Sequence, residues 1–335
     1  MNQLSDNKDI DVVGYERLQE DQHDAVCAWA TCNNVMKVYA KKCGLNFEKY
    51  ILHDGKHMTV DVDKNINTNR DKNDNINIKL KGMVSYDKLK LIQDMIKGTK
   101  IEFGKVPKKE NLESEFDLIV DSTGFHRNYL PKLEYEMWIP CVQYKVKYNN
   151  SNDLPYDDFF LKAFPSMSGY FWYFPLGNGY AHIGAGDFTK KIHNTFVDNF
   201  LRKYKCEILK KVGRPVRISP PLKSQPFTDG KKTIGVGESI GTVYPLLGEG
   251  IIPSTICADL FIQNLFNLKS YHDVILKQFA FYSVVFKFIL HKITGKFNLI
   301  KDSMDLIRIY NHMKREEDRY GMEVNLTNMF KVSRI

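Results

Sequence analysis

The sequence predicts an α/β (α+β) fold, in which strand–helix segments of a nucleotide-binding type lie on both sides of a β-rich insertion. Short apolar strands that end in acidic residues or glycine occur in "DIDVVGYERL", "FDLIVDSTG" and "TIGVGE". Between them, Tyr135–Lys147 alternates in the β manner, and Gly169–Phe188 reads as two strands about a Gly-Asn-Gly turn. The end of the chain reads as helical. We therefore expect a discontinuous domain of residues 1–130 and 215–265, an antiparallel β-rich domain of residues 131–214, and a C-terminal helical region of residues 266–335.

The elements of the first domain follow from local spacing. "CAWATCNNVMKVYAKKCGL" places apolar residues at helical intervals and stops at Gly44. "KYILHDGKHMTVDV" predicts a strand, a turn at Asp54-Gly55 and a second strand. "SYDKLKLIQDMIKG" predicts an amphipathic helix that ends at Gly98. In the insertion, "NTFVDNFLRKY" predicts a further helix.

Composition sets the class of protein without identifying it. A chain of 335 residues with 43% hydrophobic and 26% charged residues is an ordinary globular protein. The net charge of +8 would favour an anionic partner or membrane surface, but a solvated Lys-rich surface is the preferred explanation. The six cysteines form no C-x-x-C pair and no zinc spacing, so we expect reduced thiols, no bound metal and a cytoplasmic protein. Met1–Asp11 is too polar for a signal peptide.

The most hydrophobic stretch is Val274–Gly295. Lys277, Lys287, His291 and Lys292 interrupt it. It is a poor membrane span, and it suits a buried helix or a helix on a membrane surface. Peripheral contact with a membrane is therefore compatible with the sequence, and we expect no nucleic-acid partner.

A glycine-rich stretch, "TIGVGESIGTVYPLLGEGIIPSTICADLF", is the strongest candidate for a binding site. Gly235-x-Gly237-x-x-x-Gly241 is similar to a pyrophosphate-binding fingerprint, but it lies deep in the chain. A helix follows, and backbone N–H groups at its start would stabilise an anionic centre such as a phosphate or a reduced flavin. The alternative is a glycine-rich strand–helix connection. The ending around Pro245 and Gly248-Glu249-Gly250 favours the binding site.

Three other segments have both a functional and a structural interpretation. Glu16 ends a strand, where a carboxylate could bind a ribose or simply terminate the strand. "DLIVDSTG" ends at Gly124, which could admit a ligand close to the backbone or make a tight turn. "YFWYFP" could wall an apolar substrate cavity or belong to the core.

Taken together and in this order, these motifs resemble the geranylgeranyl reductase family of FAD-dependent oxidoreductases, within the p-hydroxybenzoate-hydroxylase-like flavoproteins. "GVGESIGTVYPLLGEGI" resembles that family's G-D-A-A-G-x-x-x-P-x-x-G-E-G-I, "DLIVDSTGFHR" its D-x-x-x-D-A-T-G segment, and "YFWYFP" its aromatic-W-x-F-P substrate motif. "VVGYERL" is similar to its ribose-binding strand, and "CAWATCNNVMK" to a segment beside the flavin. The resemblance covers roughly Asp9 to Leu265.

The resemblance implies a Rossmann-like FAD-binding domain and reduction of C=C bonds in geranylgeranyl chains of membrane lipids, which in archaea are ether-linked. It also implies a reduced electron donor, NAD(P)H or ferredoxin, and a prenylated lipid substrate. It assigns no general acid, and Cys27 is a weak candidate for a catalytic role. The residues implied to bind the cofactor are Glu16, Arg17, Cys27, Ala28, Asp121, Thr123, Gly124, Gly237, Glu238, Gly241, Pro245, Gly248, Glu249, Gly250 and Ile251, and those implied to bind the substrate are Tyr170, Trp172, Phe174 and Pro175.

Only Met1–Lys8 precede "DIDVVGYE", whereas the family begins with a further strand and a G-x-G-x-x-G loop. We therefore expect an N-terminally truncated FAD-binding domain. Two other functions stay open: a non-catalytic relative that binds lipid or a protein partner, and a flavin-dependent oxidase or monooxygenase that acts on another apolar substrate.

Overall fold

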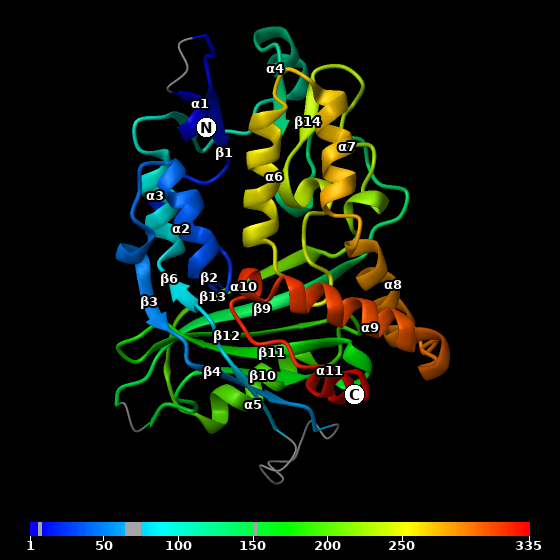
Figure 1. Ribbon diagram of the computed structural model, residues 1–335. Coiled ribbons are helices and arrows are strands. Elements are labelled where there is room, and N and C mark those ends of the chain that lie inside the picture. The colour runs from blue at the N-terminus through cyan, green and yellow to red at the C-terminus, as the bar shows by residue number, and fades with distance from the viewer. Residues whose placement is uncertain (6–8, 64–74, 151–152) are drawn as a thin grey trace.

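The computed structural model describes residues 1–5, 9–63, 75–150 and 153–335. Figure 1 shows a lower layer formed by a large sheet, an upper part with short strands and the helices α2, α3, α6 and α7, and a group of C-terminal helices beside the sheet. The helices are α1 (Asn2–Ser5), α2 (Asn33–Lys42), α3 (Lys88–Ile96), α4 (Lys109–Glu115), α5 (His193–Lys203), α6 (Ile251–Gln263), α7 (Leu268–Gln278), α8 (Tyr282–Ile293), α9 (Leu299–Arg315), α10 (Glu317–Tyr320) and α11 (Leu326–Ser333). The fold is a mixed α/β fold, as predicted.

Two parallel strand pairs form the upper part. Strand β1 (Val13–Glu16) pairs with β7 (Lys100–Phe103), and β8 (Ile119–Asp121) pairs with β14 (Thr233–Gly235). The second pair places Gly235, at the end of "TIG", opposite Asp121, at the end of "IVD", although the two residues are 114 positions apart in the sequence. Because parallel strands end at the same edge, the turns after β8 and β14 lie side by side.

The large sheet has seven strands in the order β13-β9-β12-β11-β10-β4-β5. Their bounds are β4 (His57–Asp61), β5 (Ile76–Lys79), β9 (Trp138–Lys147), β10 (Phe159–Ala163), β11 (Gly169–Pro175), β12 (Tyr180–Asp187) and β13 (Glu207–Arg217). Strands β9 to β13, from the predicted β-rich domain, pair antiparallel as expected. Strand β10 also pairs in parallel with β4, so the seven-stranded sheet as a whole is mixed. Strands β4 and β5 come from residues that we expected in the other domain. The domain limits stay a prediction, since a shared sheet does not define a folding unit.

The turn at Asp54-Gly55 separates two sheets. Strand β3 (Ile51–Asp54) joins β6 (Met83–Tyr86) and β2 (Ala30–Cys32), whereas β4 enters the large sheet. The distant carboxylate of Asp158 accepts hydrogen bonds from the backbone N–H groups of Lys56 (2.7 Å) and His57 (2.9 Å). The two predicted strands therefore form, but they do not pair with each other.

The hairpin β11–β12 has two different faces, because successive side chains of a strand point to opposite sides. Phe171 and Tyr173 pack with α5 residues such as Val197 in one buried cluster. Trp172 and Phe174 belong to a second cluster on the other face, which meets the upper part of the molecule. The predicted turn is confirmed: residues 177–179 all have positive φ.

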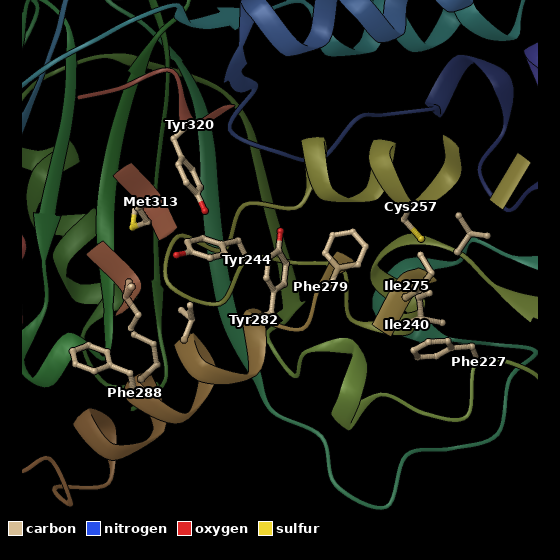
Figure 2. Packing of buried hydrophobic residues seen from close by; sticks show 14 of the residues in the cluster. Phe227, Ile240, Tyr244, Cys257, Ile275, Phe279, Tyr282, Phe288, Met313 and Tyr320 are labelled. Carbon is tan, nitrogen blue, oxygen red and sulfur yellow. The ribbon is translucent and has the colours of Figure 1, made fainter. Parts of the chain in front are cut away.

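The C-terminal helices share a core with the glycine-rich segment. Tyr244, from that segment, lies between Tyr282 and Tyr320 with ring centroids 5.2 and 5.4 Å away (Figure 2). Cys257 of α6 is fully buried in the same cluster. These contacts fix the loop that follows β14 against helices encoded 40 to 80 residues later.

Among the described residues, no single helix is long and apolar enough to cross a membrane, although α7 and α8, bent by 50° at their junction, meet that length and composition as a pair.

Burial of His182 makes stability depend on pH. The side chain is 3% exposed, and burial lowers its pKa from 6.5 to about 4, although the Ala28 carbonyl 3.3 Å away opposes the shift. The unfolded chain therefore binds more protons between pH 6.5 and 4, so stability falls as the pH is lowered through this range. We expect His182 to account for a loss of about 2 kcal/mol between pH 7 and pH 4.5. The free energy of unfolding of His182→Gln, measured in urea, should therefore fall by about 2 kcal/mol less between pH 7 and pH 4.5 than that of the parent chain. An equal fall in both proteins would contradict the prediction.

Candidate functional site

The glycines of the segment after β14 fall into two groups. An added Cβ at Gly235 would lie 2.3 Å from Ile240 Cγ2, and one at Gly241 would lie 2.4 Å from the Ser219 carbonyl oxygen. At Gly237 and Gly248, which have φ of +77° and +59°, the nearest protein atoms would be 3.4 and 3.8 Å away. The first group therefore serves close packing, and the second leaves space beside the backbone.

That open space belongs to a cavity of about 1040 Å³ between the glycine-rich segment, the sheet and the C-terminal helices. Thirteen of the residues predicted for the site line it: Cys27, Ala28, Gly124, Tyr170, Trp172, Phe174, Gly237, Glu238, Pro245, Gly248, Glu249, Gly250 and Ile251. The cavity brings together segments that are separated by more than 200 residues in the sequence. Its volume exceeds that of a usual small-molecule pocket, so it has room for a large ligand or for two.

The other predicted site residues lie outside the cavity wall. Asp121 is fully buried, and its carboxylate accepts hydrogen bonds from Thr123 Oγ1 (2.7 Å) and from backbone N–H groups of residues 123, 129 and 130. Glu16 accepts from the backbone N–H of Leu18 (2.9 Å), and Arg17 is exposed. Gly241 and Pro175 are also outside it. For Asp121 and Thr123, the contacts describe a stabilised turn, and their predicted role in cofactor binding stays a prediction.

Arg214, which the sequence did not single out, joins two of the site motifs, those of Gly124 and Glu238. Its Nη2 lies 2.8 Å from Glu238 Oε2, and the same carboxylate accepts from the backbone N–H of Arg217 (2.9 Å). A Cβ at Gly124 would approach Arg214 Nη2 to 2.7 Å. Gly124, Glu238 and Arg214 thus form one polar corner of the cavity. Only the strand register brings Arg214 here, so no local motif could have found it.

A second polar corner was also missed. Arg319 of α10 donates from Nη2 to Glu249 Oε2 (2.8 Å) and to the hydroxyl of Tyr282 (3.2 Å). The Glu249 Oε1 accepts from the backbone N–H of Ile252 in the first turn of α6 (3.2 Å). Burial raises the pKa of Glu249, and the charge of Arg319 opposes that rise. The pair therefore anchors the Gly248–Gly250 loop to the C-terminal region.

Strand β11 forms the apolar wall. The Tyr170 hydroxyl donates to the carbonyl of Leu247, so this wall is bonded directly to the glycine-rich loop. Trp172 Nε1 is buried and has no hydrogen-bond partner among the described residues. The remaining lining is rich in aliphatic and methionine side chains, among them Met58, Val60, Met83, Leu161, Met167, Leu306, Ile309 and Met313. Such a lining suits a long apolar ligand.

Four cysteines line the cavity, Cys27, Cys32, Cys43 and Cys141. Burial raises the pKa of Cys141 to about 12, so its thiol is protonated at neutral pH. The backbone carbonyl of Cys27 accepts from Gln143 Nε2 (2.9 Å), which holds this loop against strand β9. Ser85, another site neighbour, donates to the carbonyl of Pro175 and supports the end of β11.

Comparisons with known proteins agree with this arrangement. The family model of the geranylgeranyl reductase catalytic domain matches residues 138–218. Digeranylgeranylglycerophospholipid reductase 2 of Methanothermobacter thermautotrophicus is 30% identical over 124 residues, which are 36% of this chain. The chain spans 31% of the length of that relative.

Solved structures resemble the whole chain more extensively. A geranylgeranyl bacteriochlorophyll reductase-like protein from Thermoplasma acidophilum has a TM-score of 0.63 at 15% identity, covering 86% of this chain and 83% of its own. A flavin-dependent halogenase from Xanthomonas campestris has a TM-score of 0.59 at 11% identity, covering 87% and 74%. These likenesses show the fold of flavin-dependent enzymes. Together with the matched catalytic-domain region and the motifs around the cavity, they support the resemblance to the geranylgeranyl reductase family.

Proposed function

We propose that this chain binds FAD and reduces C=C bonds in geranylgeranyl chains of membrane lipids or their precursors. The observation that carries the proposal is that the glycine-rich loop and the aromatic strand β11 open on one cavity. The loop offers backbone without side chains at Gly237 and Gly248, and the strand offers an apolar wall. A flavin ring requires backbone that it can approach closely, and a prenyl chain beside it requires an apolar wall.

The residues present fit a flavin. Gly237 and Gly248 would hold the ring system, because they line the cavity and have no side chain to occupy it, and Gly250 lines the cavity beside them. The start of α6 would stabilise negative charge on it through the positive end of the helix dipole and the backbone N–H of Ile251, since the N–H of Ile252 is bonded to Glu249 and Pro253 has none. A bound flavin supplies the hydride equivalent for reduction of an isolated double bond.

The protein residues then position the lipid and exclude water. Trp172 and Phe174 face the cavity and would hold a prenyl chain against the glycine loop. The protonated Cys141 thiol holds a proton at the cavity wall, and Cys27 is the predicted neighbour of the flavin. The electron donor would be NAD(P)H or a reduced ferredoxin, and the proposed location is the cytoplasmic side of the membrane.

The first test compares two glycines with the same backbone strain. Gly248 and Gly44 have φ of +59° and +72°, and an added Cβ would meet no protein atom within 3.4 Å at either position. We expect Gly248→Ala to weaken FAD binding about tenfold or more, because the methyl group occupies space at the ring. Gly44→Ala should bind FAD like the parent chain. Visible spectra of the purified proteins titrated with FAD would measure this; a parent chain that binds no flavin would refute the proposal.

The reaction itself is tested under anaerobic conditions. The flavin-loaded protein, reduced by dithionite, should be reoxidised when a geranylgeranylated glycerolipid is added, and the lipid should gain two hydrogens per double bond by mass spectrometry. Reoxidation only by oxygen would favour an oxidase or monooxygenase. Lipid binding without flavin uptake would favour a non-catalytic relative.

A further inference from the structure

Helix α9 exposes an apolar stripe to solvent. Ile300, Met304 and Ile307 are 86%, 57% and 37% exposed and lie at intervals of four and three residues, so they share one face of the helix. Exposed large aliphatic side chains are common singly but rarely line up along a helix. The stripe therefore indicates a surface that contacts something apolar.

The same face is cationic. Across residues 300–315, the exposed positions are Ile300, Lys301, Met304, Ile307, Arg308, Asn311, Lys314 and Arg315, and none of them is acidic. The two carboxylates of this segment are buried: Asp302 bonds to His291 Nδ1 (2.8 Å), and Asp305 pairs with Lys287 (3.0 Å). Of the four cations, Arg308 lies 3.4 Å from Asp305 and Lys314 lies 2.6 Å from Glu317, but the side chains of both are more than 40% exposed, so solvent screens these pairs. Three large apolar side chains among four cations are the composition of a helix that lies in the interface of an anionic membrane.

The opposite face of α9 lines the cavity. Leu306, Ile309 and Met313 are at most 6% exposed and form part of the cavity wall. A helix is about 10–12 Å thick with its side chains, so a surface that binds α9 from outside lies one helix diameter from the cavity. Figure 1 shows α9 running from α10 beside the large sheet, between α8 and α11 in this view.

From these three observations we propose that the outer face of α9 docks the protein on an anionic phospholipid bilayer, with Ile300, Met304 and Ile307 inserted among the acyl chains. Lys301, Arg308 and Arg315 face the lipid phosphates. The inference rests on the proposed function in one respect, namely that the cavity takes a lipid, which then enters from the membrane beside α9. The charge of this face favours an anionic bilayer over a neutral apolar protein surface, because only the bilayer would interact favourably with the four exposed cations.

Flotation of the full chain with lipid vesicles tests the docking face. We expect binding to phosphatidylcholine vesicles that contain phosphatidylglycerol, and much less binding to phosphatidylcholine alone. Ile300→Ser/Met304→Ser/Ile307→Ser should lower the vesicle affinity about tenfold or more, because it removes the inserted side chains. Lys301→Gln/Arg308→Gln should lower it by a similar factor and reduce its salt dependence, since each cation contributes about fivefold.

Phe266→Ser is the matched control. Phe266 is 90% exposed, like Ile300, but lies in the connection between α6 and α7. It should float like the parent chain. An equal loss with Phe266→Ser, or no loss with either α9 variant, would overturn the proposal, as would binding that is indifferent to phosphatidylglycerol.

Flavin uptake and the urea midpoint are measured on the same preparations. Parent-like values in the α9 variants show that folding is intact and that any lost flotation reports docking. A parent chain that floats without taking up FAD refutes the proposed reductase and supports the docking face. One that takes up FAD without floating overturns the docking face alone.

Discussion

Replacing Gly241 by alanine is expected to lower the free energy of unfolding by about 2–5 kcal/mol, because two costs add at this position. Gly241 has φ of +83°, a conformation that costs an L-residue about 1–2 kcal/mol. The added Cβ would also lie 2.4 Å from the Ser219 carbonyl oxygen and 2.9 Å from the Pro220 carbonyl carbon. Both neighbours are backbone atoms, so relief requires a shift of the chain near residue 220.

Gly98→Ala separates the two costs. Gly98 has φ of +82°, and no protein atom lies within 4 Å of its added Cβ. It should lose only the backbone term of about 1–2 kcal/mol. Urea unfolding of both variants gives the difference, which measures the packing around Gly241. Equal losses would mean that the loop after β14 rearranges freely.

Replacing Arg319 by methionine should cost about 3 kcal/mol, because it leaves a mostly buried carboxylate without its cation. The side chains of Arg319 and Glu249 are 11% and 22% exposed and lie 2.8 Å apart. Burial already raises the pKa of Glu249, and loss of Arg319 raises it further. The folded variant then binds protons more strongly than the unfolded chain, so its deficit should shrink as the pH is lowered from 7.

Lys314→Met is the control for Arg319→Met. Lys314 also pairs with a carboxylate, Glu317, at 2.6 Å, but its side chain is 43% exposed. We expect a loss below about 1 kcal/mol with little dependence on pH, because solvent screens exposed pairs. The double variant Glu249→Gln/Arg319→Met should lose less than Arg319→Met alone. If Arg319→Met and Lys314→Met lose the same amount, the pair does not anchor the loop.

Much of the secondary structure could be predicted from local sequence. The Gly-Asn-Gly turn and its flanking aromatics gave the hairpin β11–β12, since a two-strand unit is determined by its own turn. The helical spacing before Gly98 gave α3, which runs from Lys88 to Ile96. What spacing could not give was pairing between distant segments. The parallel contact of β4 with β10 depends on residues about 100 positions apart, and no turn encodes it.

In the candidate site, too, local motifs could be predicted, whereas contacts between distant segments could not. The glycine motif and the aromatic strand were found from their own residues, and the structure places both on one cavity. Arg214 and Arg319 were missed because each reaches its carboxylate from a separate element. A single arginine in a Lys-rich chain carries no positional signal, since its partner is specified only by the three-dimensional register.

The hydrogen bond from Tyr170 to the Leu247 carbonyl has a consequence for the order of binding. It joins the wall proposed for the lipid to the loop proposed for the flavin, so movement of either one is transmitted to the other. Such a connection is reciprocal: if the lipid tightens flavin binding by some factor, the flavin tightens lipid binding by the same factor. The two ligands would then assemble as a cooperative pair, with neither held at full strength until both are present.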